Sequence, residues 1–126
     1  MKTYEERGLR QAGIKLIATG DITDDGVLEA MGDPTLGLIT SFHYSAAHDS
    51  AENATFKKAF ADVNGDKQRP NFMAAAGYDG MAAIYEALKK TSGSTDADQL
   101  IAVMKGMKII SPRGPIMIDP ETRDVV

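Results

Sequence analysis

Apolar side chains recur at helical spacing along Asn71–Gly93, the longest apolar segment of the chain. The repeating positions are Met73, Gly77, Met81, Ile84 and Leu88, with a second apolar flank at Phe72, Tyr78 and Tyr85. This pattern predicts a long helix that buries more than one narrow stripe. Gly77 and Gly80 are poor helix formers, so we expect them to let another backbone approach closely. Such a helix is typical of the layer that covers a sheet in an α/β domain.

Shorter patterned segments surround this helix. Two apolar runs rich in β-forming residues, Ile14–Thr19 and Leu36–Phe42, predict buried parallel strands. Further elements are expected as helices over 4–12, 23–31, 52–64 and 95–107, and as a brief strand at 116–118 before a truncated returning strand. Two short strands and part of a hairpin cannot cover so many apolar helices. We therefore expect an α/β chain that is a fragment of a larger protein.

The composition is that of an ordinary globular protein, with 126 residues, 43% hydrophobic and 25% charged. The formal net charge of −4 gives no basic surface for nucleic acid. No apolar run reaches the length of a membrane span, and the absence of Cys excludes disulfides and thiol chemistry. The first four residues lack the apolar core of a signal peptide. This indicates a cytosolic protein or a chain that begins inside a longer one.

Three acidic residues follow the first expected strand, where α/β folds hold ligands. We expect Thr23 to cap the next helix and Asp24 and Asp25 to lie in its first turn as solvated charges. Asp21 caps nothing obvious, so a ligand-facing carboxylate and a solvated charge both stay open. The segment also resembles the start of a calcium loop, but its twelfth position is Gly32 instead of Glu, which makes calcium the weaker interpretation.

His43 and His48 are the only histidines, and their spacing fits neither a helical metal pair nor a catalytic triad. We interpret them as residues of a polar loop. Phe42 ends a strand, so its ring could line a cleft, although packing is the commoner role. No phosphate-binding glycine loop or nucleophile elbow is present. A hydrolase using Asp21 and His43 would need their side chains within roughly 2.6–3.2 Å.

Five segments occur together in an order that resembles a known family. They are GLRQAGIKLIATGD, MGDPTLGLITSFHY, SAENATFKKAFAD, NFMAAAGYDGMAAIYEALKKTSG and MKGMKIISPRGPIMIDPETRD. Together they resemble the carboxyl-terminal third of a periplasmic leucine/isoleucine/valine-type solute-binding protein. Such proteins are extracellular ligand-binding receptors of ABC transporters and have the type I periplasmic binding fold.

The resemblance implies two α/β lobes that are joined by three crossing segments and hold the ligand between them. It assigns residues 1–39 to a piece of the second lobe and residues 40–44 to a hinge crossing. Residues 45–126 would be a piece of the first lobe that ends near the last crossing. Most of both parent sheets would then lie outside this chain.

The resemblance also implies site residues. In amino-acid binders of this family, an acid in the loop after the first strand receives the ligand's ammonium group. The match falls on Gly20–Ile22, where Asp21 is the only acid and Ile22 lies beside it. The family more often has Glu slightly later, and the shorter Asp indicates another ligand, for instance an aromatic acid. Phe72 or Met73 matches an aromatic that flanks the ligand, and Phe42 is a further candidate. Residues that grip the ligand carboxylate would lie outside the chain.

The function implied is the substrate-binding component of an ABC importer in the periplasm. Its ligand would be a branched-chain or other amino acid, or a related small carboxylate, and its partner an ABC permease. Neither catalysis, a cofactor nor nucleic acid is expected. The alternative is a ligand-sensing lobe of a regulator or receptor with the same fold. Uncovered sheet edges and helix faces also predict that the chain self-associates.

Overall fold

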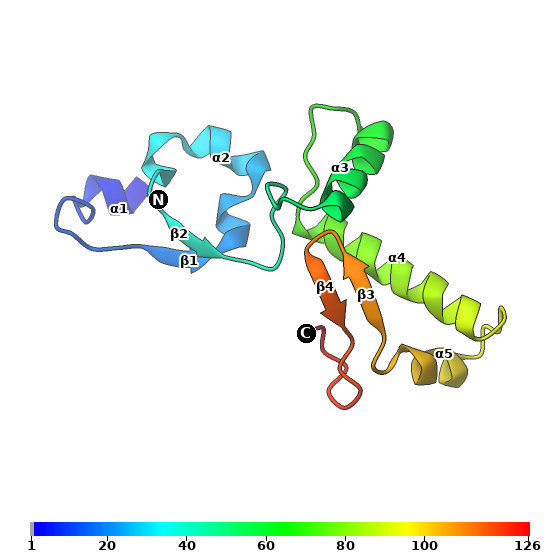
Figure 1. The fold of residues 1–126 in the computed structure, drawn as a ribbon. Coiled ribbons are helices and arrows are strands. Elements are labelled where there is room, and N and C mark those ends of the chain that lie inside the picture. The colour runs from blue at the N-terminus through cyan, green and yellow to red at the C-terminus, as the bar shows by residue number, and fades with distance from the viewer. Residues whose placement is uncertain (1) are drawn as a thin grey trace.

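Residues 2–126 are described by a computed structural model, in which the chain forms two parts linked by a joining segment, residues 42–50 (Figure 1). The first part contains α1 (Lys2–Glu6), β1 (Ile17–Thr19), the 3-10 helix η1 (Gly20–Thr23), α2 (Asp25–Met31), the 3-10 helix η2 (Asp33–Thr35) and β2 (Ile39–Ser41). The second part contains α3 (Ala51–Asn64), α4 (Phe72–Lys90), α5 (Ala97–Met104), β3 (Lys108–Ser111) and β4 (Gly114–Met117). Met1, where the expected second-lobe piece begins, lies outside the described residues.

The two strands of the first part pair in parallel, as the sequence predicted. Ile17 lies opposite Ile39, and the pairing continues to the ends of both strands. Both strands are shorter than expected, and the prediction that they are buried is wrong for this chain. Ile17 is 69% exposed because no helix of residues 2–126 covers that face of the pair. The helix expected over 4–12 ends at Glu6 and continues as turns.

The cap of α2 differs from the prediction by one residue. Asp24, not Thr23, is the N-cap, and its Oδ1 accepts a hydrogen bond from the Gly26 amide at 2.9 Å. The Thr23 hydroxyl instead donates to the Gly20 carbonyl oxygen at 3.1 Å and lies 3.2 Å from the Thr40 hydroxyl. Thr23 is therefore used to hold the loop after β1 against β2.

Polar caps define the two long helices of the second part. Ser50 caps α3 by accepting from the Asn53 amide at 3.1 Å, and α3 ends at Gly65, whose φ of 85° is accessible to glycine. Asn71 caps α4, as predicted, and its Oδ1 accepts from the Met73 and Ala74 amides. These caps fix where each helix meets the joining segment and the loop before α4.

The buried face of α4 is not the face that the sequence predicted. Its buried residues are Ala75, Asp79, Ala83 and Ala87. Small side chains on this face let α5 and the β3–β4 hairpin pack closely, and Ala83 and Ala87 form a core with Met107. On the predicted stripe Met73 is 68% exposed and Met81 is 45% exposed. A β-carbon at Gly77 or Gly80 would meet nothing within 4 Å, so no backbone of the described chain approaches there.

The antiparallel hairpin completes the second part. Lys108 pairs with Met117 and Ser111 with Gly114, and Ile118 forms a single bridge with Val125. The sequence predicted the second strand and the return, but it missed β3. The expected helix over 95–107 runs past the observed end of α5 because Gly106, at φ 73°, terminates it and releases Met107 into the turn before β3.

Candidate functional site

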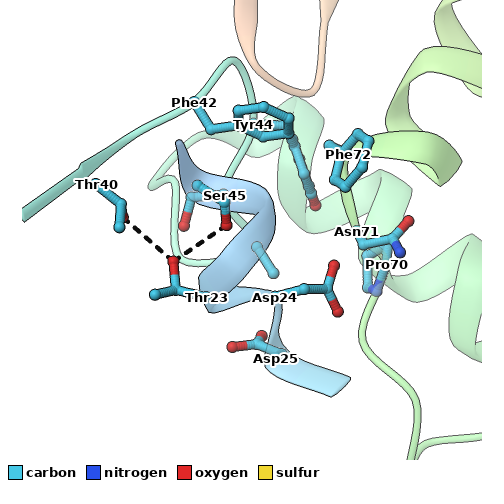
Figure 2. Close-up of a pocket in the computed structure, with 12 residues that line it drawn as sticks. Thr23, Asp24, Asp25, Thr40, Phe42, Tyr44, Ser45, Pro70, Asn71 and Phe72 are labelled. Atoms are coloured by element: carbon cyan, nitrogen blue, oxygen red, sulfur yellow. Dashed lines mark hydrogen bonds between the residues drawn. The ribbon is translucent and has the colours of Figure 1, made fainter. Parts of the chain in front are cut away.

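A pocket of about 310 Å³ lies where the two parts of the chain meet. Figure 2 shows the loop after β1, with Thr23, Asp24 and Asp25, on one side. The joining segment, with Tyr44 and Ser45, and the start of α4, with Asn71 and Phe72, complete the lining. The pocket is therefore built from segments that are far apart in the sequence and contains both carboxylates and aromatic rings.

Close packing fixes the loop after β1 against the joining segment. A β-carbon added at Gly20 would overlap the Phe42 side chain, lying 3.0 Å from its Cγ and nearer still to its Cβ. Glycine is therefore the residue that allows Phe42 to lie against the start of η1. The contact sets the position of the Phe42 ring at the pocket edge.

The joining segment is anchored to α3 through a fully buried amide. The Tyr44 hydroxyl donates to Oδ1 of Asn53 at 2.9 Å. Asn53 Nδ2 donates to the His48 carbonyl oxygen at 2.7 Å and to the Ala46 carbonyl oxygen at 3.3 Å. Because the side-chain oxygen and the amino group of Asn53 both have hydrogen-bond partners, Asn53 holds the loop in one conformation. This conformation places Tyr44 and Ser45 in the pocket wall.

Burial first, and the negative charge of Asp25 second, together raise the pKa of the Tyr44 phenol to about 12. The phenol thus stays protonated at neutral pH. A protonated phenol is the form that can donate to Asn53, so the electrostatics and the hydrogen bond favour the same state.

Three aromatic rings cluster beside the pocket, of which Phe42 and Phe72 line it. The Phe42 and Phe72 rings lie 4.6 Å apart in an edge-to-face arrangement. The His43 ring lies 4.4 Å from the Phe42 ring and 5.6 Å from the Phe72 ring. Rings packed on one another in this way present an apolar surface at the pocket edge, against which a planar apolar group can pack.

The residues that the sequence proposed for the site are only partly brought together. Phe42 and Phe72 line the same pocket, whereas Asp21 and Ile22 are not among its lining residues. The Asp21 carboxylate accepts a hydrogen bond from the Thr19 hydroxyl. The acids that face the pocket are Asp24, the cap of α2, and Asp25.

Asp25 and several polar residues were not expected in the site. Asp25 pairs with Arg69 at 3.4 Å, an exposed contact of little energetic weight. Thr40, Ser45 and Asn71 also line the pocket. The sequence could have indicated these residues only by their positions at the ends of predicted elements. Thr40 lies near the end of β2, Ser45 follows that strand, and Asn71 caps α4.

The described residues contain neither a hydrogen-bonded Asp21–His43 pair nor a metal-binding cluster. No hydrogen bond joins Asp21 to His43 within residues 2–126, where the Asp21 carboxylate is bonded to Thr19. The same residues contain no group of three His, Cys, Asp or Glu side chains placed to hold a metal ion. None of their helices is both long and apolar enough to cross a membrane.

A ligand-sized pocket at the junction of two linked α/β parts is a candidate small-molecule site. The family model described as periplasmic binding protein matches residues 1–126, so this chain belongs to the periplasmic binding protein family. The family and the fold class expected from the sequence are thereby confirmed. The division at residues 39 and 44 stays a prediction.

Several similar proteins are described as binding proteins for small solutes. The chain is 42% identical over 125 residues to "Leu/Ile/Val-binding protein homolog 6" of Brucella abortus (strain 2308), covering 99% of this chain and 32% of that protein. A crystal structure of an ABC-transporter solute-binding protein from Rhodopseudomonas palustris BisB5, in complex with 3,4-dihydroxybenzoic acid, has 58% identity and a TM-score of 0.86. The match covers 100% of this chain and 34% of that one.

A second solute-binding protein, from Rhodopseudomonas palustris HaA2 in complex with p-hydroxybenzoic acid, has 40% identity and a TM-score of 0.85. That match covers 98% of this chain and 34% of the other chain. The chain thus spans about a third of the length of these relatives.

Proposed function

We propose that this chain forms one wall of the ligand cleft of an ABC-importer solute-binding protein that works in the periplasm. Its ligand is a small carboxylate, either an amino acid or an aromatic acid, and we favour the aromatic acid. The observation that carries this proposal is the pocket in which Phe42 and Phe72 bring their rings to 4.6 Å beside Asp24 and Asp25.

The shape and chemistry of the pocket support an aromatic acid. A volume of about 310 Å³ suits a single substituted ring. The edge-to-face pair of Phe42 and Phe72 offers apolar contact to such a ring. The relatives that share 58% and 40% of aligned residues are in complex with hydroxylated benzoic acids. The name of the Brucella relative, a Leu/Ile/Val-binding protein homologue, supports an amino acid as the alternative ligand.

Binding in this proposal is not catalysis. Residues 40–44 are the predicted hinge crossing, around which two lobes would move as rigid bodies. A ligand favours the closed form only by the difference in its affinity for the closed and open forms. The closed, loaded protein then delivers its solute to an ABC permease. Asp21 and Ile22 stay proposed ligand contacts of the closed form, next to Asp24 on the same loop.

The chain alone is expected to bind solute weakly, because it offers one wall of the cleft. It is also expected to self-associate, since apolar side chains such as Met73 and Tyr85 are 68% and 56% exposed. Light scattering of the 126-residue chain tests the self-association. A monomer at high concentration would contradict it.

The test of the function is a thermal-shift screen of a two-lobe chimera. In the chimera this chain replaces the matching third of the BisB5 relative. Leucine, p-hydroxybenzoate and 3,4-dihydroxybenzoate are compared, because a ligand that binds only the folded state raises the melting temperature by mass action. We expect the benzoates to stabilise the chimera more than leucine does. A folded chimera stabilised by leucine and unaffected by the benzoates would refute the aromatic assignment.

A further inference from the structure

A second hollow, of about 390 Å³, lies on the joining segment and has a different charge from the first pocket. Its polar lining is His43, Ser45, His48 and Arg113, without an acidic side chain. The first pocket contains Asp24 and Asp25 and no basic residue. The two hollows share Phe42, Tyr44 and Ser45. One short stretch of chain therefore separates an acidic hollow from a basic one.

Arg113 reaches this hollow from the turn of the β3–β4 hairpin, which lies near the joining segment in Figure 1. Its Nε donates to Oδ2 of Asp79 at 3.0 Å, and the Ser111 hydroxyl donates to the same oxygen at 2.8 Å. The Arg113 amide donates to the Ser111 hydroxyl oxygen at 3.2 Å. The Asp79 and Arg113 side chains are 8% and 18% exposed, so the ion pair is held away from water.

This arrangement fixes one edge of the guanidinium group and leaves the other edge unused. Within residues 2–126 the hydrogen bond from the Arg113 side chain comes from Nε, and none comes from Nη1 or Nη2. The two Nη groups form a planar fork that matches the two oxygens of a carboxylate. Because Asp79 already orients the plane of the group, little further ordering is needed when an anion binds.

Ser45 adds a second donor to the hollow. Its Oγ accepts a hydrogen bond from the Ala47 amide at 3.2 Å, which leaves the hydroxyl hydrogen free to donate elsewhere. The loop that carries Ser45 is held by the buried Asn53. The donors thus come from two supported segments instead of one mobile side chain.

We propose that this hollow binds a carboxylate anion, with the Nη edge of Arg113 as its bidentate partner and Ser45 as an additional donor. This site lies across the joining segment from the first pocket and is separate from it, and its occupant is a small monocarboxylate such as benzoate.

The test is an NMR titration of the 126-residue chain with benzoate at constant ionic strength. The Nε–Hε signal of Arg113 and the amide signals of Ser45 and Ala47 are followed. Benzamide is the neutral control of the same shape, and inorganic phosphate is the control for a general anion site. We expect saturable shifts with benzoate, no such shifts with benzamide, and weaker shifts with phosphate. Phosphate shifts as strong as those of benzoate would overturn the carboxylate assignment, as would the absence of benzoate shifts at Arg113.

The variant Arg113→Lys keeps a positive charge beside Asp79 but removes the planar fork. We expect it to weaken benzoate binding by roughly tenfold. Arg7→Lys, on the first part of the chain, is the matched control and leaves the titration unchanged. Equal benzoate affinity in the unmodified chain, Arg113→Lys and Arg7→Lys would show that Arg113 is not part of the site. Because this assay needs no second lobe, its outcome is independent of the thermal-shift screen. Benzoate binding at Arg113 without stabilisation of the chimera would refute the proposed function. Stabilisation of the chimera without benzoate binding at Arg113 would refute the anion site.

Discussion

The Tyr44 hydroxyl donates a 2.9 Å hydrogen bond to Oδ1 of Asn53, and this contact ties the joining segment to the first turns of α3. Tyr44 is 8% exposed and Asn53 is fully buried. The Phe56 and Tyr44 rings also pack edge to face, with centroids 5.9 Å apart. The wall of the proposed cleft therefore depends on a polar contact in the core.

Replacing Asn53 with Ala removes the partner of Tyr44 and the donors to the Ala46 and His48 carbonyl oxygens. Because these groups are left buried or half-buried without their partner, we expect the free energy of unfolding to fall by about 2–3 kcal/mol. Urea denaturation measures the change. Asn64→Ala, on the same helix but exposed and bonded to Phe60 alone, is the control. A loss in Asn53→Ala no larger than in the control would contradict the anchoring role.

Tyr44 should titrate separately from the three other tyrosines of the chain. Its pKa is raised from 10.0 to about 12 by burial first and by the Asp25 charge second. Absorbance at high pH should therefore show a component near pH 12 that is missing in Tyr44→Phe. The folded state holds this proton more tightly than the unfolded state, so its stabilising effect is complete below pH 10 and is lost as the pH rises toward 12. A Tyr44 signal that titrates near 10 would disprove the burial effect.

Gly20 and Gly77 form a matched pair of glycine positions. Gly20→Ala should destabilise the chain, because the new methyl group overlaps Phe42. Gly77→Ala lies within α4 and meets nothing within 4 Å, so it should stabilise the chain by about 0.5–1 kcal/mol. Thermal unfolding of both variants compares the two effects. Stabilisation by Gly20→Ala would show that Phe42 does not pack against this loop.

The same Gly77→Ala substitution tests an expectation that the isolated chain leaves open. In the two-lobe chimera we expect it to destabilise, since Gly77 and Gly80 would then lie against a backbone of the added part. A stabilising effect in both proteins would mean that no backbone approaches these glycines.

Asp21 and Asp24 can be separated by their different local roles. Asp24→Ser keeps a side chain able to cap α2 but removes the charge that faces the pocket. Asp21→Ala removes a carboxylate that is bonded to Thr19 and does not line the pocket. In the chimera, Asp24→Ser should weaken the binding of a hydroxybenzoate more than Asp21→Ala does. If calorimetry shows a larger loss of affinity in Asp21→Ala than in Asp24→Ser, Asp21 is the residue that contacts the ligand.

Local patterns were enough to predict much of this architecture. The cap at Asn71, the helix that follows it and the parallel pairing of β1 with β2 each have a short-range signal in the sequence. Phe42 was a site candidate because it ends a strand, and Phe72 because the family resemblance has an aromatic at the start of the long helix. Both line the same pocket. The family match over residues 1–126 follows from the order of several such segments.

Other features depend on contacts that a periodic pattern does not contain. The stripe of Met73 and Met81 is the more hydrophobic face of α4, yet the alanine face is buried because α5 and the hairpin pack there. Asp79 lies on that buried face, and its partner Arg113 is 34 residues away in the sequence. The N-cap of α2 is Asp24, one residue after the predicted Thr23, and Asp24 thereby faces the pocket. A difference of one residue is within the usual variation in where helix ends are assigned.

The central claim is that this chain forms a wall of a cleft for a small carboxylate, and isothermal titration of the chimera with 3,4-dihydroxybenzoate tests it most directly. We predict saturable binding that Phe72→Ala weakens by roughly tenfold or more, because the ring at the pocket edge is lost. Tyr85→Ala, an exposed aromatic further along α4, should leave the affinity unchanged. A folded chimera that binds no hydroxybenzoate and no amino acid, or one whose affinity is indifferent to Phe72→Ala, would contradict the account.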